Sequence, residues 1–167
     1  MTCSEKRAAV IQKLEELGIS FKLCEHDAVY TMNDIKESDK ADAPEGGIIV
    51  KNLFLKEHNS EKYFLVVASP GKNADIKSLR RFLGTKPLSF ATEEQLCEIL
   101  SVERGAVSPL AVINDKNGAV SLIIDDTLKG SVLGVHPNEN TSTLYITYSD
   151  LEKYAGSCGH MLINMQV

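Results

Sequence analysis

Several features that mark particular classes of protein are missing from this sequence. Tryptophan is absent, and only 6% of the residues are aromatic. The four cysteines form neither a C-x-x-C pair nor a dense framework, so we expect reduced thiols in a cytoplasmic protein. No apolar run is long enough to cross a bilayer, and the amphipathic N-terminus lacks the features of a secretory signal. The sequence therefore predicts no membrane association.

An excess of basic residues is also missing. Eighteen Lys and Arg face 23 Asp and Glu, which gives a formal net charge of −5. A protein that holds nucleic acid mainly through its phosphates usually carries a positive excess. We therefore expect no DNA binding, and we expect any RNA contact to be local and weak, or supplied partly by a partner.

Familiar catalytic signatures do not occur either. The sequence has no G-x-S-x-G, no P-loop and no G-x-G-x-x-G motif. Two C-x-H pairs, Cys24 with His26 and Cys158 with His160, would make a metal site only if they met in the fold. Their spacing differs from that of structural zinc sites. We therefore predict neither a metal nor a cofactor, and rank a metal-dependent hydrolase last among the alternatives.

What is present is an ordinary globular composition. The chain has 167 residues, 43% hydrophobic and 25% charged, enough for one domain with a substantial core. No repeat or linker divides it, so we predict a single domain over residues 1–167. Several strands are joined by turns too short for crossover helices. This favours an α/β domain of the α+β type, with a mixed, largely antiparallel sheet flanked by helices.

Capping residues and apolar periodicity place the elements along the chain. Helices are expected after Ser4, at 75–83, from Thr92 to 100, and after Ser149, with a short one near 31–35. A loop is expected over 38–47. Strands are expected at 19–25, 47–55, 63–68, 119–125, 132–136 and 143–147, with an edge strand at 160–163.

The first candidate segment for chemistry is Val50-Lys51-Asn52-Leu53-Phe54-Leu55. A lysine within an apolar strand is costly to bury unless it meets an anion or a carbonyl. The alternative is a lysine whose ammonium reaches solvent beside an edge strand. Lys51 and Asn52 are therefore candidate site residues, although the pattern alone favours the alternative.

The second segment is Gly105-Ala106-Val107-Ser108-Pro109, between a predicted helix and a predicted strand. Glycine and proline at its ends restrain a loop whose backbone N–H groups can converge on an anion or a developing oxyanion. An ordinary helix-to-strand connection has the same composition, so this alternative stays open.

The third segment places His136 at a strand end, before a polar turn that contains Asn140 and Thr141. The imidazole could carry a proton or donate an orienting hydrogen bond. A lone histidine beside such a turn is more often structural. Separately, one helical face carries Lys77, Arg80 and Arg81, with Lys72 nearby. This is usually a solvated surface, but it is the best candidate phosphate patch in an acidic chain.

Taken together, five segments resemble the prolyl-tRNA synthetase editing-domain family, the YbaK-like or INS-like deacylases. They are KNLFL, YFLVV, DIKSLRRFLGTKPLSFATEEQL, GAVSPLAVIND and HPNENTSTLYIT, which follow the family's order over most of the chain. KNLFL and HPNENTSTL resemble the freestanding alanyl-tRNA(Pro) deacylases, the ProX or PrdX type, more than the cysteinyl-tRNA(Pro) branch.

The resemblance implies hydrolysis of the ester of Ala-tRNA(Pro), acting on the acceptor end and in trans to prolyl-tRNA synthetase. It implies that Lys51 and Asn52 position the substrate, that the loop from Gly105 to Pro109 binds the carbonyl oxygen, and that His136 shapes the aminoacyl pocket. Cysteine or serine as the removed residue stays open. A binding module without turnover is the alternative from another class.

Overall fold

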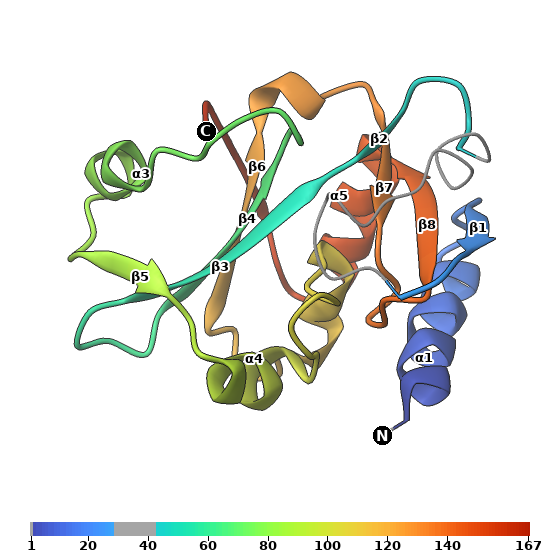
Figure 1. Cartoon of the computed structure of the whole chain (residues 1–167), viewed down its shortest axis with the longest axis horizontal. Coiled ribbons are helices and arrows are strands. Elements are labelled where there is room, and N and C mark those ends of the chain that lie inside the picture. Colours follow the sequence, from blue (N-terminus) through green and yellow to red (C-terminus); the bar gives the residue numbers. More distant parts are fainter. Residues whose placement is uncertain (1, 29–42) are drawn as a thin grey trace.

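The computed structural model describes residues 2–28 and 43–167 (Figure 1). The predicted short helix near 31–35, and the predicted loop up to residue 42, lie outside these residues. The described part contains the α-helices α1 (Cys3–Glu16), α3 (Ile76–Leu83), α4 (Glu93–Leu100) and α5 (Tyr148–Ser157), and the 3₁₀ helices η2 (Pro109–Asn114) and η3 (Asp126–Leu128). None of these helices has the length and hydropathy needed to cross a membrane.

Each α-helix begins where a side chain can cap its free N–H groups. At the start of α3 the Asp75 side chain accepts from the Ser78 N–H, and Thr92 forms the predicted capping box with Gln95 at α4. α1 and α5 begin two residues earlier than expected. Thr2 rather than Ser4 caps α1, and Thr147 rather than Ser149 caps α5.

Four strands form the first sheet, which we call sheet A, in the order β1-β8-β7-β2. They are β1 (Lys22–Glu25), β8 (Ser142–Thr147), β7 (Val132–Val135) and β2 (Gly47–Ile49). β8 is antiparallel to both of its neighbours, whereas β2 runs parallel to β7 with Ile49 opposite Gly134.

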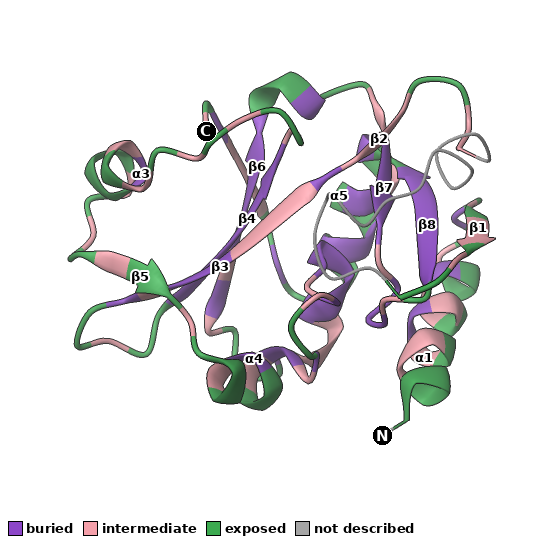
Figure 2. Ribbon diagram, in the orientation of Figure 1, coloured by how far each residue is buried: buried purple, intermediate pink, exposed green. Residues whose placement is uncertain are grey.

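Sheet B has five strands in the order β5-β3-β4-β6-β9. They are β5 (Leu88–Phe90), β3 (Lys51–Glu57), β4 (Tyr63–Ala68), β6 (Val120–Asp125) and β9 (Leu162–Met165). β3 is antiparallel to β4 and β5, and the pairs β4–β6 and β6–β9 are parallel. β4 is buried along its whole length (Figure 2), as its continuous apolar sequence predicted.

The chain passes from one sheet to the other at Val50. This residue separates β2 from β3, and its N–H still donates to Gly134 O at 3.2 Å. The sequence predicted one strand over 47–55, whereas the structure divides that stretch between two partners. The mixed α/β architecture is confirmed, with two mixed sheets in place of one.

Apolar side chains pack on both faces of sheet B. The larger core cluster lies between the two sheets and helices α1, α4 and α5, and includes Val50, Phe54 and Val67. The smaller cluster lies on the opposite face, where Leu79 of α3 packs against Leu55 and Val66. Neighbouring residues of β3 therefore face different environments, which determines where the candidate site residues point.

Candidate active site

Lys51 is the first residue of β3, immediately after the crossover at Val50. It is half-buried, and within the described part of the chain its ammonium makes no ion pair and no hydrogen bond. In β3 it alternates with Asn52, so it lies on the face of Leu53 and Leu55, away from the larger core. A half-buried ammonium without a protein partner is available to an anionic or carbonyl ligand.

His136 follows β7 on the corresponding face of sheet A. Every second residue along β2 and β3 lies on one face, which holds Gly47, Ile49 and Lys51. Gly134 of β7 lies opposite Ile49, and a Cβ built on it would lie 3.1 Å from Ile49 Cγ1. Because residues i and i+2 of a strand share a face, His136 emerges on the face that Lys51 occupies. The structure therefore brings these two predicted residues to the point where the sheets diverge.

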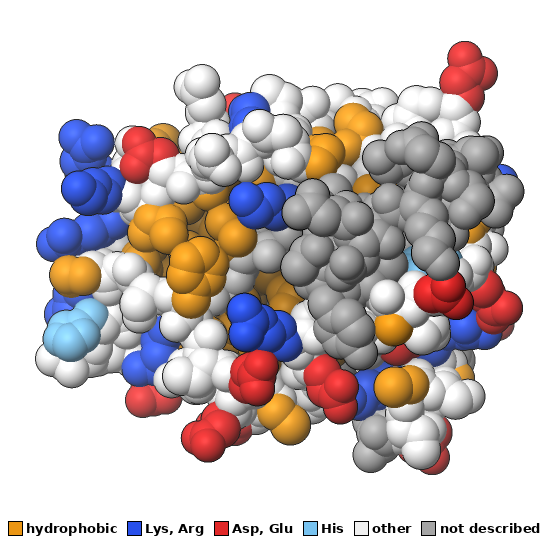
Figure 3. Space-filling view, in the orientation of Figure 1, with side chains coloured by type: hydrophobic (Ala, Val, Ile, Leu, Met, Phe, Trp, Pro, Cys, Tyr) orange, Lys and Arg blue, Asp and Glu red, His pale blue; other side chains and the backbone are white. Residues whose placement is uncertain are grey.

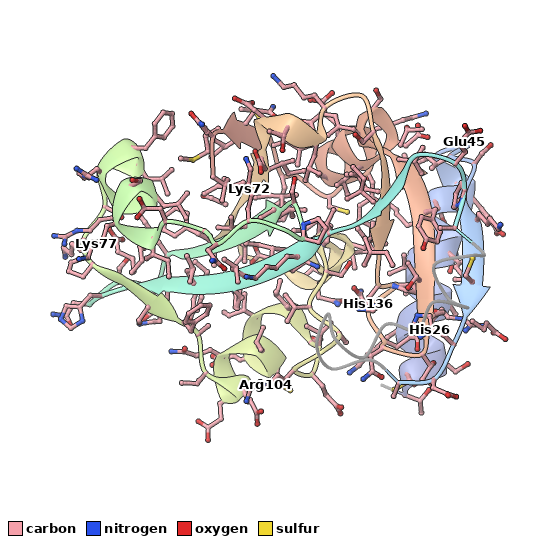
Figure 4. The ribbon with its side chains drawn as sticks, turned by 45° about the horizontal axis from the view of Figure 1, so that its top comes forward. His26, Glu45, Lys72, Lys77, Arg104 and His136 are labelled. Atoms are coloured by element: carbon pink, nitrogen blue, oxygen red, sulfur yellow. The ribbon has the colours of Figure 1, made fainter. Side chains whose placement is uncertain are left out.

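A second histidine lies beside His136. The ring centroids of His26 and His136 are 6.4 Å apart in an edge-on arrangement, and Figure 4 shows both at the same end of sheet A. His26 Nε2 is 2.8 Å from Thr143 Oγ1, and its Nδ1 donates to Asp27 O at 2.7 Å. These contacts connect the end of β1 to β8 and to the candidate site.

The hydrogen bonding of His136 determines its tautomer. Its Nδ1 lies 3.1 Å from Ser142 O, and a carbonyl can only accept, so Nδ1 carries the proton and Nε2 is left as an acceptor. Burial lowers the pKa of His136 below its usual range, outweighing the opposing effect of the Ser142 carbonyl. The neutral ring is therefore the form that the site favours.

The turn after His136 is organised by a buried carboxylate. Glu139 is only 3% exposed. It accepts hydrogen bonds from the Thr141 N–H at 2.7 Å and from the hydroxyls of Thr141 and Ser142. Burial raises the pKa of Glu139, but these hydrogen bonds outweigh it and hold the pKa below its usual range. Of the two predicted residues in this turn, Thr141 supports the turn, while Asn140 is half-buried.

The loop from Gly105 to Pro109 connects α4 to η2. Gly105 has a φ of 91°, a left-handed conformation that favours glycine. The Ala106 N–H donates to Glu103 O at 3.0 Å, and the Ser108 side chain caps η2 by accepting from the Leu110 N–H. Within the described residues, the N–H groups of Gly105, Val107 and Ser108 have no acceptor. These amides are the donors that the loop can offer to an oxyanion.

Asn52 faces the same side of sheet B as this loop. It pairs with Val67, whose side chain belongs to the larger core cluster together with Ala106. Asn52 Oδ1 is buried and accepts no hydrogen bond from the residues that the structure describes. Such a group is costly unless a ligand or water supplies the missing donor.

The four residues of the predicted phosphate patch do not share one environment. Lys77, Arg80 and Arg81 are exposed on α3. Lys72 instead forms an ion pair with Asp125, at 2.9 Å from Oδ2, and Asp125 is fully buried. Figure 4 shows Lys72 well separated from Lys77. The ammonium of Lys72 is thus already paired with a carboxylate, whereas the exposed basic side chains of α3 are available to a ligand.

The C-x-H pairs do not come together. His26 contacts Thr143, whereas the buried His160 binds Asp115 Oδ2 at 2.8 Å. Over residues 2–28 and 43–167, no three potential ligands among His, Cys, Asp and Glu cluster as a metal site requires. An open groove of about 930 Å³ lies at the hairpin end of β3 and β4, lined by residues such as Glu57, Thr85 and Ser121, and no predicted site residue lines it.

Sequence reasoning missed two contributors to this site. Glu139 was not singled out within the polar turn, although the hydroxyl residues two and three positions later could have indicated a buried carboxylate. His26 was considered only as a metal ligand. Nothing local shows that it approaches His136, because the contact depends on pairing between β1 and β8.

The fold and these side chains define a class of protein: a small α/β domain in which an ammonium without a partner among the described residues and a neutral imidazole share one face, while the loop amides lie on the side of the larger core. These are groups that an ester hydrolase uses. The model of the aminoacyl-tRNA editing domain family matches residues 26–154. The chain belongs to this family and is an aminoacyl-tRNA editing protein. The resemblance predicted from the five sequence segments is thereby confirmed.

Individual relatives agree with this assignment. The chain is 42% identical over 157 residues to the prolyl-tRNA editing protein ProX of Acetoanaerobium sticklandii, covering 93% of this chain and 94% of the relative. It is 31% identical to prolyl-tRNA synthetase associated domain-containing protein 1 of Bos taurus, covering 96% and 94%. A crystal structure of a candidate trans-editing enzyme for prolyl tRNA synthetase has a TM-score of 0.73 over 99% of both chains, at 23% identity, and shares the fold.

Proposed function

We propose that this chain is a freestanding deacylase that hydrolyses the ester of mischarged Ala-tRNA(Pro). The observation that carries the proposal is the half-buried ammonium of Lys51, which has no partner within residues 2–28 and 43–167 and shares a face with His136. The similarity to the ProX relative supports tRNA(Pro) as the carrier.

Such an activity meets a chemical need. An active site built for proline cannot exclude a smaller side chain such as alanine by size alone, because a hydrophobic pocket discriminates by only about 1–3 kcal/mol per methylene. A second site that admits alanine and rejects proline supplies the missing discrimination. We propose that His136, with Asn140 and Thr141 beside it, shapes that pocket.

The reaction is the addition of water to the ester carbonyl carbon. The oxyanion that develops accepts hydrogen bonds from the N–H groups of Val107 and Ser108. Asn52 Oδ1, which has no donor among the described residues, accepts a hydrogen bond from the attacking water and orients it. Collapse of the intermediate breaks the bond between the carbonyl carbon and the ribose oxygen and releases alanine. A proton of the attacking water passes to that ribose oxygen, and the neighbouring ribose hydroxyl assists this transfer.

Binding of the tRNA is divided between two parts of the surface. Lys51 holds the phosphate of the terminal adenosine or the ester region. The exposed basic residues of α3 hold phosphates of the acceptor end, and prolyl-tRNA synthetase is the expected partner that delivers the substrate. We expect residues 1–167 to act as one editing domain in the cytoplasm.

The test is the release of radiolabelled alanine from Ala-tRNA(Pro), with Pro-tRNA(Pro) and Cys-tRNA(Pro) beside it. Lys51→Ala should abolish release. Lys56→Ala is the matched control, because Lys56 is also half-buried on β3 but lies near its opposite end. It should retain the wild-type rate.

Each outcome has a distinct meaning. Loss of alanine alone, abolished only by Lys51→Ala, establishes the reaction and the site. Release of cysteine instead would keep the reaction and overturn the substrate. If no charged tRNA is deacylated by the pure wild-type protein, the chain is a binding module and the proposed function fails.

A further inference from the structure

An exposed aromatic side chain lies on the same face of sheet B as Lys51. Phe90 ends the edge strand β5 and stands opposite Leu55 of β3. Because cross-strand partners share a face, Phe90 lies on the side that Lys51, Leu53 and Leu55 occupy. Leu55 is fully buried beneath α3, yet Phe90 is 61% exposed. This face therefore presents an aromatic ring to solvent beside the candidate active site.

The segment that leads to this ring is basic within an acidic chain. Residues 72–91 contain five basic residues and a single acidic one, whereas the whole chain has a net charge of −5. The acidic residue, Asp75, is occupied in capping α3. Ile76, Leu79 and Leu83 of α3 pack toward the sheet. Lys77, Arg80 and Arg81 stay exposed. Figure 3 shows apolar side chains over this region with Lys and Arg side chains on either side.

The spacing fits a short single strand. Four residues along β3 and one step to β5 separate Lys51 from Phe90, which corresponds to about 14 Å. Phe90 would thus lie within reach of the last unpaired nucleotides of a tRNA whose ester is held at Lys51. Proteins recognise unpaired RNA ends by stacking bases on aromatic side chains and holding the phosphates with basic ones.

We propose that Phe90 is a stacking platform for an unpaired base at the 3′ end of the tRNA acceptor arm, with α3 holding the adjoining phosphates. The proposal rests on the proposed function, because it takes the site at Lys51 as the position of the ester. A protein partner fits less well, because the exposed charges of α3 (Lys77, Arg80 and Arg81) are all basic and complement a polyanion.

The experiment measures binding of two uncharged RNA hairpins that mimic the tRNA(Pro) acceptor stem, one with its unpaired 3′ end and one cut back to a blunt end. Phe90→Ala should weaken binding of the first hairpin about 10-fold, the size of a lost base stack, and leave binding of the blunt hairpin unchanged. Phe90→Trp should restore binding, since it retains an aromatic face.

Phe82→Ala is the matched control. Phe82 is 66% exposed, similar to Phe90, but it lies on α3 and not on the sheet. It should bind both hairpins as the wild type does. The proposal is overturned if Phe90→Ala binds the first hairpin normally, or if it loses affinity equally for both. Loss of binding to prolyl-tRNA synthetase with normal RNA binding would assign the ring to a protein interface instead.

Deacylation measured on the same preparations separates this proposal from the proposed function. A wild-type protein that releases alanine while Phe90→Ala binds normally would refute only the stacking role. A protein that needs Phe90 to bind the unpaired end but releases no amino acid would refute only the deacylase.

Discussion

The ring of Tyr145 fills the space in which a side chain on Gly134 would stand. A Cβ at position 134 would lie 2.8 Å from Tyr145 Cε1 and 3.2 Å from Thr143 Cγ2, and Tyr145 is only 3% exposed. Gly134→Ala should therefore reduce the free energy of unfolding by about 1–3 kcal/mol, the usual cost of overpacking. Urea denaturation measures this change. Deacylation should fall as well, because His136 lies two residues further along.

Gly71→Ala is the control for this substitution. A Cβ at position 71 would have nothing within 4 Å, and Gly71 does not have a positive φ. Its free energy of unfolding should stay within about 0.5 kcal/mol of the wild type. A Gly134→Ala protein that is equally stable would mean that β7 and β8 do not pack as described.

Asn52 should show opposite effects on stability and on activity. Its buried Oδ1 has no donor among the described residues, so Asn52→Leu removes an unsatisfied polar group. We expect the free energy of unfolding to rise by about 0.5–2 kcal/mol. Deacylation should fall by about 100-fold if Asn52 orients the water, which is comparable with the loss of an oxyanion donor.

Asn114 provides the comparison. Its Nδ2 donates to Leu100 O at 2.9 Å, so Asn114→Leu should lose stability by about 1 kcal/mol. Thermal unfolding of both variants, followed by single-turnover deacylation, separates the two roles. An Asn52→Leu protein that is destabilised as much as Asn114→Leu would show that Asn52 has a structural partner.

Local signals in the sequence predicted much of the fold. Thr92 with Gln95, and Asp75 with Gly84, delimit α4 and α3 because each cap is formed by residues close in sequence. Where two hydroxyl residues near the start of a helix could both cap it, the sequence pattern did not identify the right one. Thr2 is followed three residues later by Glu5 and completes a capping box, whereas Ser4 is followed by Arg7.

Pairing between distant strands could not be predicted in the same way. No turn residue separates the two strands within residues 48–55, because β2 and β3 follow directly on each other and only their partners differ. β5 was missed because three residues carry too little pattern, and its pairing with β3 defines it. The same reason explains the site: Lys51 and His136 were found from their own segments, but His26 depended on the β1–β8 pairing.

The activity should depend on pH through His136. Burial lowers the pKa of this ring, as does the nearby His26, so the neutral form persists below the ordinary histidine value of about 6.5. The acid limb of the kcat/KM profile should therefore lie below pH 6.5 and should disappear in His136→Asn. His58→Gln, which changes an exposed histidine, should keep the wild-type profile.

The free energy of unfolding should also depend on pH through His136, and it should fall as the pH falls. The folded pKa of His136 lies below the unfolded one, so the unfolded chain takes up the proton first as the pH falls. The contribution of His136 is complete above about pH 6.5 and declines as the pH drops toward the folded pKa. Urea denaturation between pH 7 and pH 5 should show a smaller decline in His136→Asn than in the wild type. An equal decline in both would contradict the lowered pKa.

We expect Lys72 to contribute to stability and Lys77 to contribute to RNA binding. Burial raises the pKa of Asp125, but the hydrogen bonds from Lys72 and Thr127 outweigh it and hold the pKa low. Lys72→Met leaves this buried carboxylate without its ion pair and should cost about 1–3 kcal/mol at pH 7. Because the pKa is lowered, the ion pair stabilises the protein above the unfolded value of about 3.9 and its contribution is lost as the pH falls through the folded pKa. The difference between Lys72→Met and the wild type should therefore shrink below about pH 4.

Lys77→Met should leave the free energy of unfolding unchanged and act on RNA instead. Lys77 is exposed on α3 and has no acidic partner in the described part of the chain. Removing one phosphate contact should lower the slope of log affinity against log salt by about 1, measured with the acceptor-stem hairpin. Lys72→Met should keep the wild-type slope, since Asp125 already neutralises that ammonium. If the slope changes in Lys72→Met and not in Lys77→Met, the phosphates bind near Lys72 and the end of β6, and α3 does not bind them.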